Sequence, residues 1–209
     1  MDVLNHKFTP ETWPEHPERA TLEAKNKFVG FWLFLGGETI LFATLFATYL
    51  ALRNSGPEGF EHTTQNLYDL KLVLVMTLLL LTSSLTSVYA MYHLRNYNFR
   101  KMQLWLGFTA FLGLGFLMLE VYEFTHYVGL GFTYNNSAFS SAFYTLVGTH
   151  GLHVAIGLVW ITLLIFRNAK RGLNLYNASK YYTFSLYWHF IDVVWVFIFT
   201  AVYLMGVIG

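Results

Sequence analysis

The sequence predicts an all-α fold, namely a polytopic membrane bundle of five transmembrane helices. Of its 209 residues, 55% are hydrophobic and only 12% are charged, whereas soluble domains average about 25% charged residues. Five apolar runs, each long enough for about 20 residues of helix, are separated by short polar segments. A helix of about 20 residues crosses the ~30 Å hydrocarbon core of a bilayer. The polar segments are too short to form a separate soluble domain.

A polar segment precedes the first apolar run. Residues 1–27 carry charges of both signs and three prolines within eight positions, Pro10, Pro14 and Pro17. This composition is typical of an extended, solvated arm and lacks the apolar core of a signal peptide. Residues 28–209 are expected to form the transmembrane domain, with spans at about 28–52, 72–92, 102–124, 140–166 and 182–207.

The basic residues predict the orientation of the bundle. Eleven Lys and Arg residues lie in the arm and in the segments after the second and fourth runs, whereas Arg53 and Lys71 alone lie in the segments of the opposite side. Cytoplasmic segments carry the excess of Lys and Arg in membrane proteins. The N-terminus is therefore predicted to be cytoplasmic and the C-terminus outside. The net charge of +1 gives no reason to expect a nucleic-acid partner.

The last run contains two ionisable residues. His189 and Asp192 stand within Ser185 to Phe199 and are three positions apart, so a helix places them on one face. An ionisable side chain inside the membrane costs a few kcal/mol or more unless it faces a partner. This helix is therefore expected to pack against polar groups of another helix.

Other ionisable residues fall into two sets by their depth in the runs. Glu38, His150, His153, His189 and Asp192 lie at depths that allow one buried set, whereas Glu120, Glu123 and His126 are expected near the outer interface. Which of them pair cannot be read from spacing. The hydroxyl cluster Thr82, Ser83, Ser84, Thr86 and Ser87 can bond to its own helix or to a neighbour.

Three interpretations of these polar residues remain open. The first is a set of hydrogen bonds that joins the helices. The second is a metal site, because Glu123-x-x-His126 has the spacing of di-iron bundles and His150-x-x-His153 places two imidazoles on one face. Only one Glu-x-x-His motif is present, far in depth from Glu38 and Asp192. No cysteine is available as a ligand.

The third interpretation is proton handling. Burial in lipid favours the protonated form of a carboxyl group, so Glu38 can exchange protons. An independent proton-coupled carrier is a related possibility, as is an independent membrane metalloenzyme. Transporters commonly show repeated halves with matched breaks in their helices, and the five runs show neither.

Four motifs together resemble subunit III of the haem-copper terminal oxidases, the cytochrome c oxidase subunit 3 family. They are Gly30-Phe31-Trp32-Leu33-Phe34-Leu35 followed by Glu38, then Glu123, then Gly148-Thr149-His150-Gly151-Leu152-His153-Val154, and finally Tyr187-Trp188-His189-Phe190-Ile191-Asp192-Val193-Val194-Trp195. The resemblance covers the whole chain after the arm. It is strongest to the short, five-helix bacterial form of the Bacillus type.

The resemblance implies an accessory, non-catalytic subunit of a proton-pumping oxygen reductase in the bacterial cell membrane. Subunit III of that family carries no haem, copper or other metal, since these belong to partner subunits. It implies subunit I as the main contact, subunits II and IV as further partners, and structural phospholipid between the helices. The chain would stabilise the complex and sustain proton uptake by subunit I. The proton-related or buried polar positions of the family match Glu38, Glu123, His150, His153, His189 and Asp192.

The chain departs from many family members in its number of helices. Those members have seven, and the first two form one arm of a lipid-filled cleft, whereas here these two are absent. A lipid cleft would then need another chain to supply the missing helices. The related quinol oxidase is the near alternative, because donor binding belongs to other subunits and no residue of this chain distinguishes the electron donor.

Overall fold

The computed structural model describes residues 9–53, 55, 69–169 and 172–208. Within these residues all regular secondary structure is helical, and none of them forms a strand. The elements are η1 (Pro17–Arg19), α1 (Leu22–Leu52), α3 (Leu70–Arg95), α4 (Phe99–Gly129), α5 (Ala138–Asn168), α6 (Leu175–Ile198), the π-helical turn η2 (Phe199–Leu204) and α7 (Met205–Ile208). Five segments are long and apolar enough to cross a membrane, the last of them running from α6 to Val207. The predicted all-α bundle of five spanning helices is confirmed.

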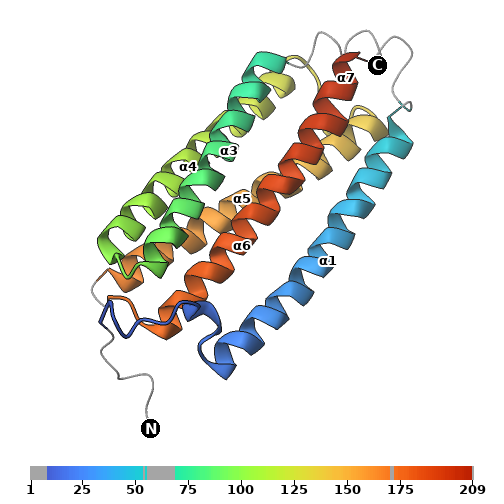
Figure 1. Ribbon diagram of the computed structural model, residues 1–209. Helices are drawn as coiled ribbons and strands as arrows, with labels where there is room; N and C mark the ends of the chain where they lie inside the picture. Colours follow the sequence, from blue (N-terminus) through green and yellow to red (C-terminus); the bar gives the residue numbers. More distant parts are fainter. Residues whose placement is uncertain (1–8, 54, 56–68, 170–171, 209) are drawn as a thin grey trace.

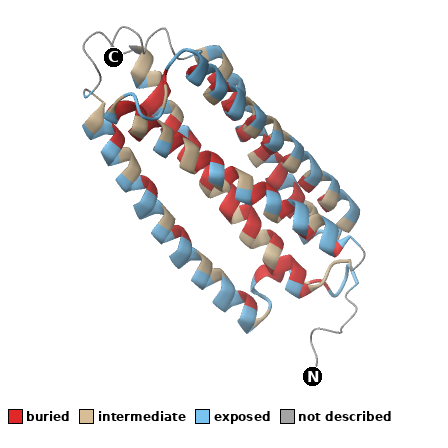
Figure 2. Ribbon diagram, turned by 180° about the vertical axis from the view of Figure 1, so that it is seen from behind, coloured by how far each residue is buried: buried red, intermediate tan, exposed pale blue. Residues whose placement is uncertain are grey.

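The helices form a compact group of four with α1 at its side (Figure 1). α3 and α4 form a hairpin that packs against α5 and α6, and α1 packs chiefly against α5 and α6. Only 11% of the most apolar window of α1 is buried, compared with 28% to 39% in the other four spans. Buried residues accordingly gather along the central helices, while α1 is exposed over most of its surface (Figure 2).

Side-chain caps define where four of the helices begin. Thr21 Oγ1 accepts a hydrogen bond from the backbone N–H of Ala24 at the start of α1, at 3.1 Å. Asp69 and Asn174 cap α3 and α6 in the same way, and Ser137 forms a reciprocal capping box at the start of α5. These caps satisfy backbone donors that the first turn of a helix leaves without a partner.

The N-terminal segment differs from the predicted extended arm. The ring of Trp13 packs on that of Tyr97, with centroids 5.0 Å apart, in the turn between α3 and α4. Glu18 is buried beside Arg95, with 4.0 Å between Glu18 Oε1 and Arg95 Nη2. Helix α1 starts at Leu22 rather than at about residue 28. Its cap, Thr21, lies before the apolar run, so the helix begins in the polar segment. Residues 1–8 of the predicted arm lie outside the described residues.

Trp188 of α6 occupies the centre of the four-helix group. A Cβ atom at Gly113 of α4 would lie 2.7 Å from the indole ring, and a Cβ atom at Gly157 of α5 would lie 2.8 Å from it. The indole N–H donates to Ser83 Oγ of α3 at 3.0 Å. One side chain therefore contacts all three neighbouring helices, and the two glycines provide the space that it fills.

The hydroxyl cluster of α3 bonds both within its own helix and to its neighbours. Thr86 Oγ1 donates to the Ser83 carbonyl and lies 2.8 Å from Thr109 Oγ1 of α4. Ser87 Oγ lies 3.1 Å from Ser185 Oγ of α6. The cluster therefore bonds to its own helix and also to neighbouring helices, which are the two possibilities that the sequence left open.

We predict that Gly157→Ala destabilises the bundle by about 1–3 kcal/mol, the usual cost of overpacking a core. The added methyl group would overlap the Trp188 ring. Thermal unfolding in mild detergent, followed by helical circular dichroism, measures the effect. Gly107→Ala is the matched control, because nothing beyond its chain neighbours and its own stretch of helix backbone lies within 4 Å of a Cβ atom at Gly107. Equal stability of the two variants would contradict the role given to Trp188.

Candidate functional site

The six buried polar positions predicted from the sequence form several separate contacts between helices and do not converge on one centre. Among the described residues, no group of three His, Cys, Asp or Glu side chains could hold a metal ion. The contacts lie at the α1–α5, α3–α6, α5–α6 and α4–η2 interfaces.

The contact between α1 and α5 joins Glu38 to His153. Glu38 Oε2 lies 3.1 Å from His153 Nε2, and both side chains are largely buried, with 16% and 13% exposed. His153 Nδ1 lies 2.7 Å from the carbonyl oxygen of Thr149. A carbonyl only accepts hydrogen bonds, so Nδ1 carries a hydrogen. The bond to Glu38 then requires one further proton, held by the imidazolium or by the carboxylic acid.

Aromatic residues of α1 and α6 surround this proton-bearing pair. The ring of Phe42 packs on that of His153, with centroids 5.2 Å apart. The hydroxyl group of Tyr187 donates to the backbone carbonyl of His153 at 3.1 Å. The pair therefore lies where α1, α5 and α6 meet, beside aromatic side chains.

The contact between α3 and α6 is centred on Ser84. His189 Nδ1 lies 2.7 Å from Ser84 Oγ, and His189 Nε2 lies 3.3 Å from Ser185 Oγ. Neither carboxyl oxygen of Asp192 has a hydrogen bond of normal geometry, although Ser84 lies close enough to interact with this group. His189 and Asp192 thus share the face of α6 that their spacing indicated, and this face meets the hydroxyl cluster of α3.

His150 makes a different contact from His153, although only three residues separate them. Its side chain is fully buried, and Nε2 lies 3.3 Å from the backbone carbonyl of Ile191 in α6. Its ring packs on that of Trp195, with centroids 5.0 Å apart. The two imidazoles point to different helices, so the His-x-x-His motif does not form a pair of ligands.

Glu123 joins α4 to the C-terminal turn of the bundle. Its carboxyl group accepts hydrogen bonds from the hydroxyl groups of Tyr127 at 2.6 Å and of Tyr203 at 2.9 Å. Tyr203 belongs to the π-helical turn η2, a feature that often occurs near functional sites. His126 is instead exposed and stacks on Tyr122. The spacing Glu123-x-x-His126 therefore does not bring two ligands together.

Glu120 is a buried carboxyl group that the sequence analysis placed at the outer interface. It is 2% exposed, and neither of its oxygens has a hydrogen-bond partner. A Cβ atom at Gly151 of α5 would lie 2.5 Å from Glu120 Oε2, so the glycine makes room for this group. Glu120 therefore lies level with Gly151, the neighbour of His150, rather than at the shallow depth expected for it. The expected shallow depth of Glu123 and His126 stays a prediction. The spacing of three residues between Glu120 and Glu123 was the sequence signal for this burial, since it places both side chains on one helix face.

Comparison with known proteins gives the family. The family model described as cytochrome c oxidase subunit III matches residues 18–207. The chain belongs to this family. The predicted resemblance is confirmed, and it extends over the buried contacts described above.

Curated relatives of this family match along nearly their whole length. The chain is 68% identical to cytochrome c oxidase subunit 3 of Bacillus subtilis (strain 168), covering 99% of both chains. It is 67% identical to the protein of the same name in Bacillus sp. (strain PS3), covering 97% of this chain and 98% of the relative. It is 48% identical to the probable quinol oxidase subunit 3 of Staphylococcus haemolyticus (strain JCSC1435), covering 90% of this chain and 93% of the relative.

For this member of the subunit III family we predict that Tyr203→Phe lowers the free energy of unfolding by about 1 kcal/mol, the net value of one hydrogen bond. Chemical or thermal unfolding in detergent measures the loss. Combining it with Tyr127→Phe should cost more than the sum of the single changes, because the buried Glu123 carboxyl group then loses both phenolic donors. Tyr134→Phe, at an exposed position, is the control. Strict additivity would contradict a shared Glu123 contact.

Proposed function

We propose that this chain is the accessory subunit III of a proton-pumping haem-copper oxygen reductase, a cytochrome c oxidase of the bacterial cell membrane. It would contribute no redox centre, and oxygen reduction would take place on the haem and copper of partner subunits. Two relatives with more than 60% identity carry the name cytochrome c oxidase subunit 3. The excess of Lys and Arg supports a cytoplasmic N-terminus and a C-terminus outside.

The proton-bearing contact between Glu38 and His153 is the observation that carries the proposed mechanism. The hydrogen-bond geometry requires a proton shared between these two groups. Because both side chains retain some exposure at the α1–α5 seam, this proton can exchange with the surroundings of the complex. The pair would help subunit I to maintain proton uptake during turnover. His150, His189, Asp192 and Glu123 would hold the helices in place through their contacts.

The exposed apolar faces support contacts with partners and lipid. Leu33 and Ile40 of α1 are more than two-thirds exposed, and so is Phe111 of α4. In the membrane these faces would contact subunit I, subunits II and IV, and structural phospholipid. The open sides of α1 are where helices from another chain could complete the bundle.

A quinol oxidase is the alternative assembly. Its support is the 48% identity to the probable quinol oxidase subunit 3 of Staphylococcus haemolyticus. The same contacts of this chain would serve either enzyme, because the electron donor binds elsewhere. An independent metalloenzyme receives no support from the geometry, since the candidate ligands lie in separate contacts. An independent proton-coupled carrier would need a pathway for protons on both sides of Glu38.

The proposal predicts that Glu38→Gln yields an assembled complex with slowed or self-limiting turnover. Glutamine can still hydrogen-bond to His153 but cannot carry the exchangeable proton of a carboxyl group. Oxygen consumption over successive turnovers and the ratio of this chain to haem are the measurements. Thr44→Val, on an exposed part of the same helix, is the control. Loss of assembly would indicate a structural role, and unchanged sustained turnover would remove both roles from Glu38.

A visible spectrum of the gently solubilised native complex tests membership in the oxidase itself. We expect haem bands together with larger partner chains, and these bands should stay with the partners when this chain is removed. A colourless chain that purifies alone would contradict the assignment. Iron or copper that remains bound to this chain in stoichiometric amount would restore the metalloenzyme interpretation.

A further inference from the structure

Helix α1 has only a narrow contact with the rest of the bundle. Its buried residues beyond the first turn are Leu35, Phe42 and Tyr49, which follow one another at intervals of seven and form a single stripe. Inside a membrane, burial of apolar side chains adds little to helix association, because lipid is equally apolar. A stripe of one residue in every two turns therefore holds α1 weakly, and the place of α1 depends on the contacts at its ends.

The segment before α1 crosses the end of the bundle that carries the α3–α4 turn (Figure 1). We call residues 13–19 of this segment the strap. At one end of the strap, Trp13 packs on Tyr97 in the α3–α4 turn. At the other end, η1 packs against α6 and the start of α1. The strap therefore connects the start of α1 to α6 and to the α3–α4 turn.

The turn that receives Trp13 has an unusual backbone. Tyr97 has a φ of 55°, in the left-handed region that bulky side chains rarely adopt. Such a conformation is strained and persists only where the surrounding structure favours it. The contact between the Tyr97 ring and the buried ring of Trp13 provides one such contribution. The α3–α4 turn is therefore shaped to hold the strap.

A charged contact holds the second half of the strap. Glu18 is buried, and its Oε1 lies 4.0 Å from Arg95 Nη2 at the end of α3. Arg95 Nε donates to the hydroxyl group of Tyr182 in α6 at 2.8 Å. One guanidinium group therefore joins the strap to α3 and α6 together.

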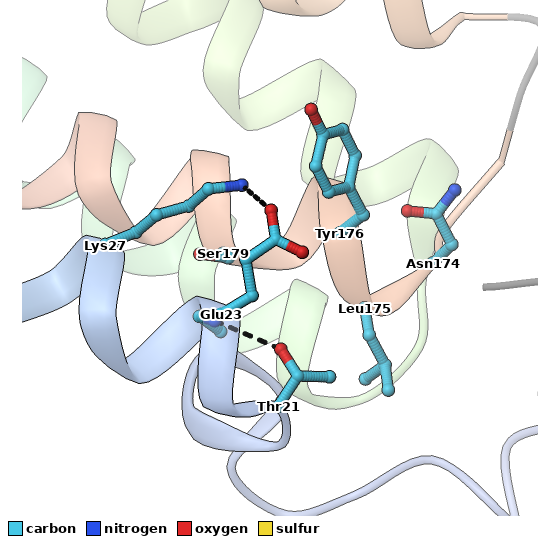
Figure 3. A pocket seen from close by; sticks show the side chains of 8 residues that line it. Thr21, Glu23, Lys27, Asn174, Leu175, Tyr176 and Ser179 are labelled. Carbon is cyan, nitrogen blue, oxygen red and sulfur yellow. Dashed lines mark hydrogen bonds and ion pairs between the residues drawn. The ribbon is translucent and has the colours of Figure 1, made fainter. Parts of the chain in front are cut away.

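Two further contacts hold the ends of α1. Figure 3 shows the first turns of α1 and α6 facing each other across a small pocket, where Lys27 Nζ lies 4.5 Å from the centroid of the Tyr176 ring. At the opposite end of α1, Arg53 Nη2 donates to the backbone carbonyl of Met205 at 2.5 Å. Helix α1 is therefore attached to the end of the last span at one side and to the strap and the start of α6 at the other.

The pair of Glu38 and His153 lies between these attachments. Glu38 is near the middle of α1, which runs from Leu22 to Leu52, and its carboxyl group reaches His153 of α5 at 3.1 Å. A hydrogen bond weakens steeply once its geometry is lost. A small displacement of α1 along or away from its narrow stripe is therefore enough to break this bond.

We propose that the strap positions Glu38 for its hydrogen bond with His153 by fixing α1 against the central helices. Trp13 and Glu18 are the positioning residues, and they act through α1 from the end of the bundle. Release of the strap lets α1 move on its stripe, so that the pair is separated for part of the time. The inference rests on the proposed role of Glu38 in proton exchange and adds the residues that control it.

Hydrogen–deuterium exchange of the purified complex, followed by mass spectrometry, tests the strap. Trp13→Ala removes the ring that packs on Tyr97, so deuterium uptake by the backbone amides of α1 should become about tenfold faster. Uptake in the middle of α4 should not change, because α4 packs against α3 and α5. Trp13→Phe retains a ring on Tyr97 and should restore most of the slow uptake.

A second variant tests the charged contact. Glu18→Gln weakens the attraction to Arg95 and should make uptake in α1 about twofold faster. Glu11→Gln, at an exposed position before the strap, is the matched control and should change nothing. Uptake in α1 that is unaltered by Trp13→Ala and Glu18→Gln would overturn the inference. Uptake that rises equally in every helix would indicate a general loss of stability and would overturn it as well.

Oxygen consumption over successive turnovers shows whether the strap acts through Glu38. Trp13→Ala should cause the self-limiting turnover expected of Glu38→Gln. The two changes combined should lose little more than Glu38→Gln alone, because both act on one contact. Losses that multiply in the double variant would assign the strap a role independent of Glu38 and would contradict the inference.

The single variants separate this inference from the proposed function. Sustained turnover that is unchanged by Glu38→Gln would overturn the proposed role of Glu38, and deuterium uptake would still decide whether the strap fixes α1. If Glu38→Gln limits turnover while the strap variants change neither uptake nor turnover, only the inference about the strap fails.

Discussion

The packing of Trp188 between Gly113 and Gly157 is the contact on which the four central helices depend. Lipid is as apolar as leucine, so the hydrophobic effect does not drive these helices together inside a membrane. Close van der Waals contact and hydrogen bonds between helices must do so instead. The indole provides both, because it fills the space above the two glycines and donates to Ser83. It thereby sets the distances at which the other contacts form.

The contacts of the remaining polar groups also follow from the absence of water inside the membrane. A buried polar group without a partner is costly, and most of the functional candidates find one on a neighbouring helix. His189 contacts the hydroxyl groups of Ser84 and Ser185, and Glu123 accepts from two phenols. Glu38 and His153 differ from these contacts because their hydrogen bond needs an additional proton. This difference separates one candidate for proton exchange from several contacts that hold helices together.

The number and approximate positions of the spans could be predicted because they depend on composition alone. A spanning segment must be apolar over a length fixed by the bilayer and must satisfy its own backbone by forming a helix. The predicted third span ended at about residue 124, whereas α4 continues to Gly129. Helix ends depend on local capping and turns, which hydropathy does not report.

The partners of the polar residues could not be predicted, for geometric reasons. His150 and His153 belong to one motif, but three residues along a helix differ by about 60° from a full turn, which is enough to direct them to different helices. Ser84 and His189 are 105 positions apart in the sequence, and no local pattern connects them. The π-helical turn η2, which presents Tyr203 to Glu123, arises within an uninterrupted apolar run and has no signal there.

The place of α1 in the bundle has a consequence for biosynthesis. This helix precedes the others in the chain, yet it packs chiefly against α5 and α6, which leave the ribosome last. Its partner residue His153 is 115 positions away from Glu38. Newly inserted α1 therefore lies in the bilayer without these contacts until α5 and α6 have been made. Glu38 is not yet joined to His153 during this time. Of the five spanning helices described here, α1 is made before the others and is among the last to reach its place.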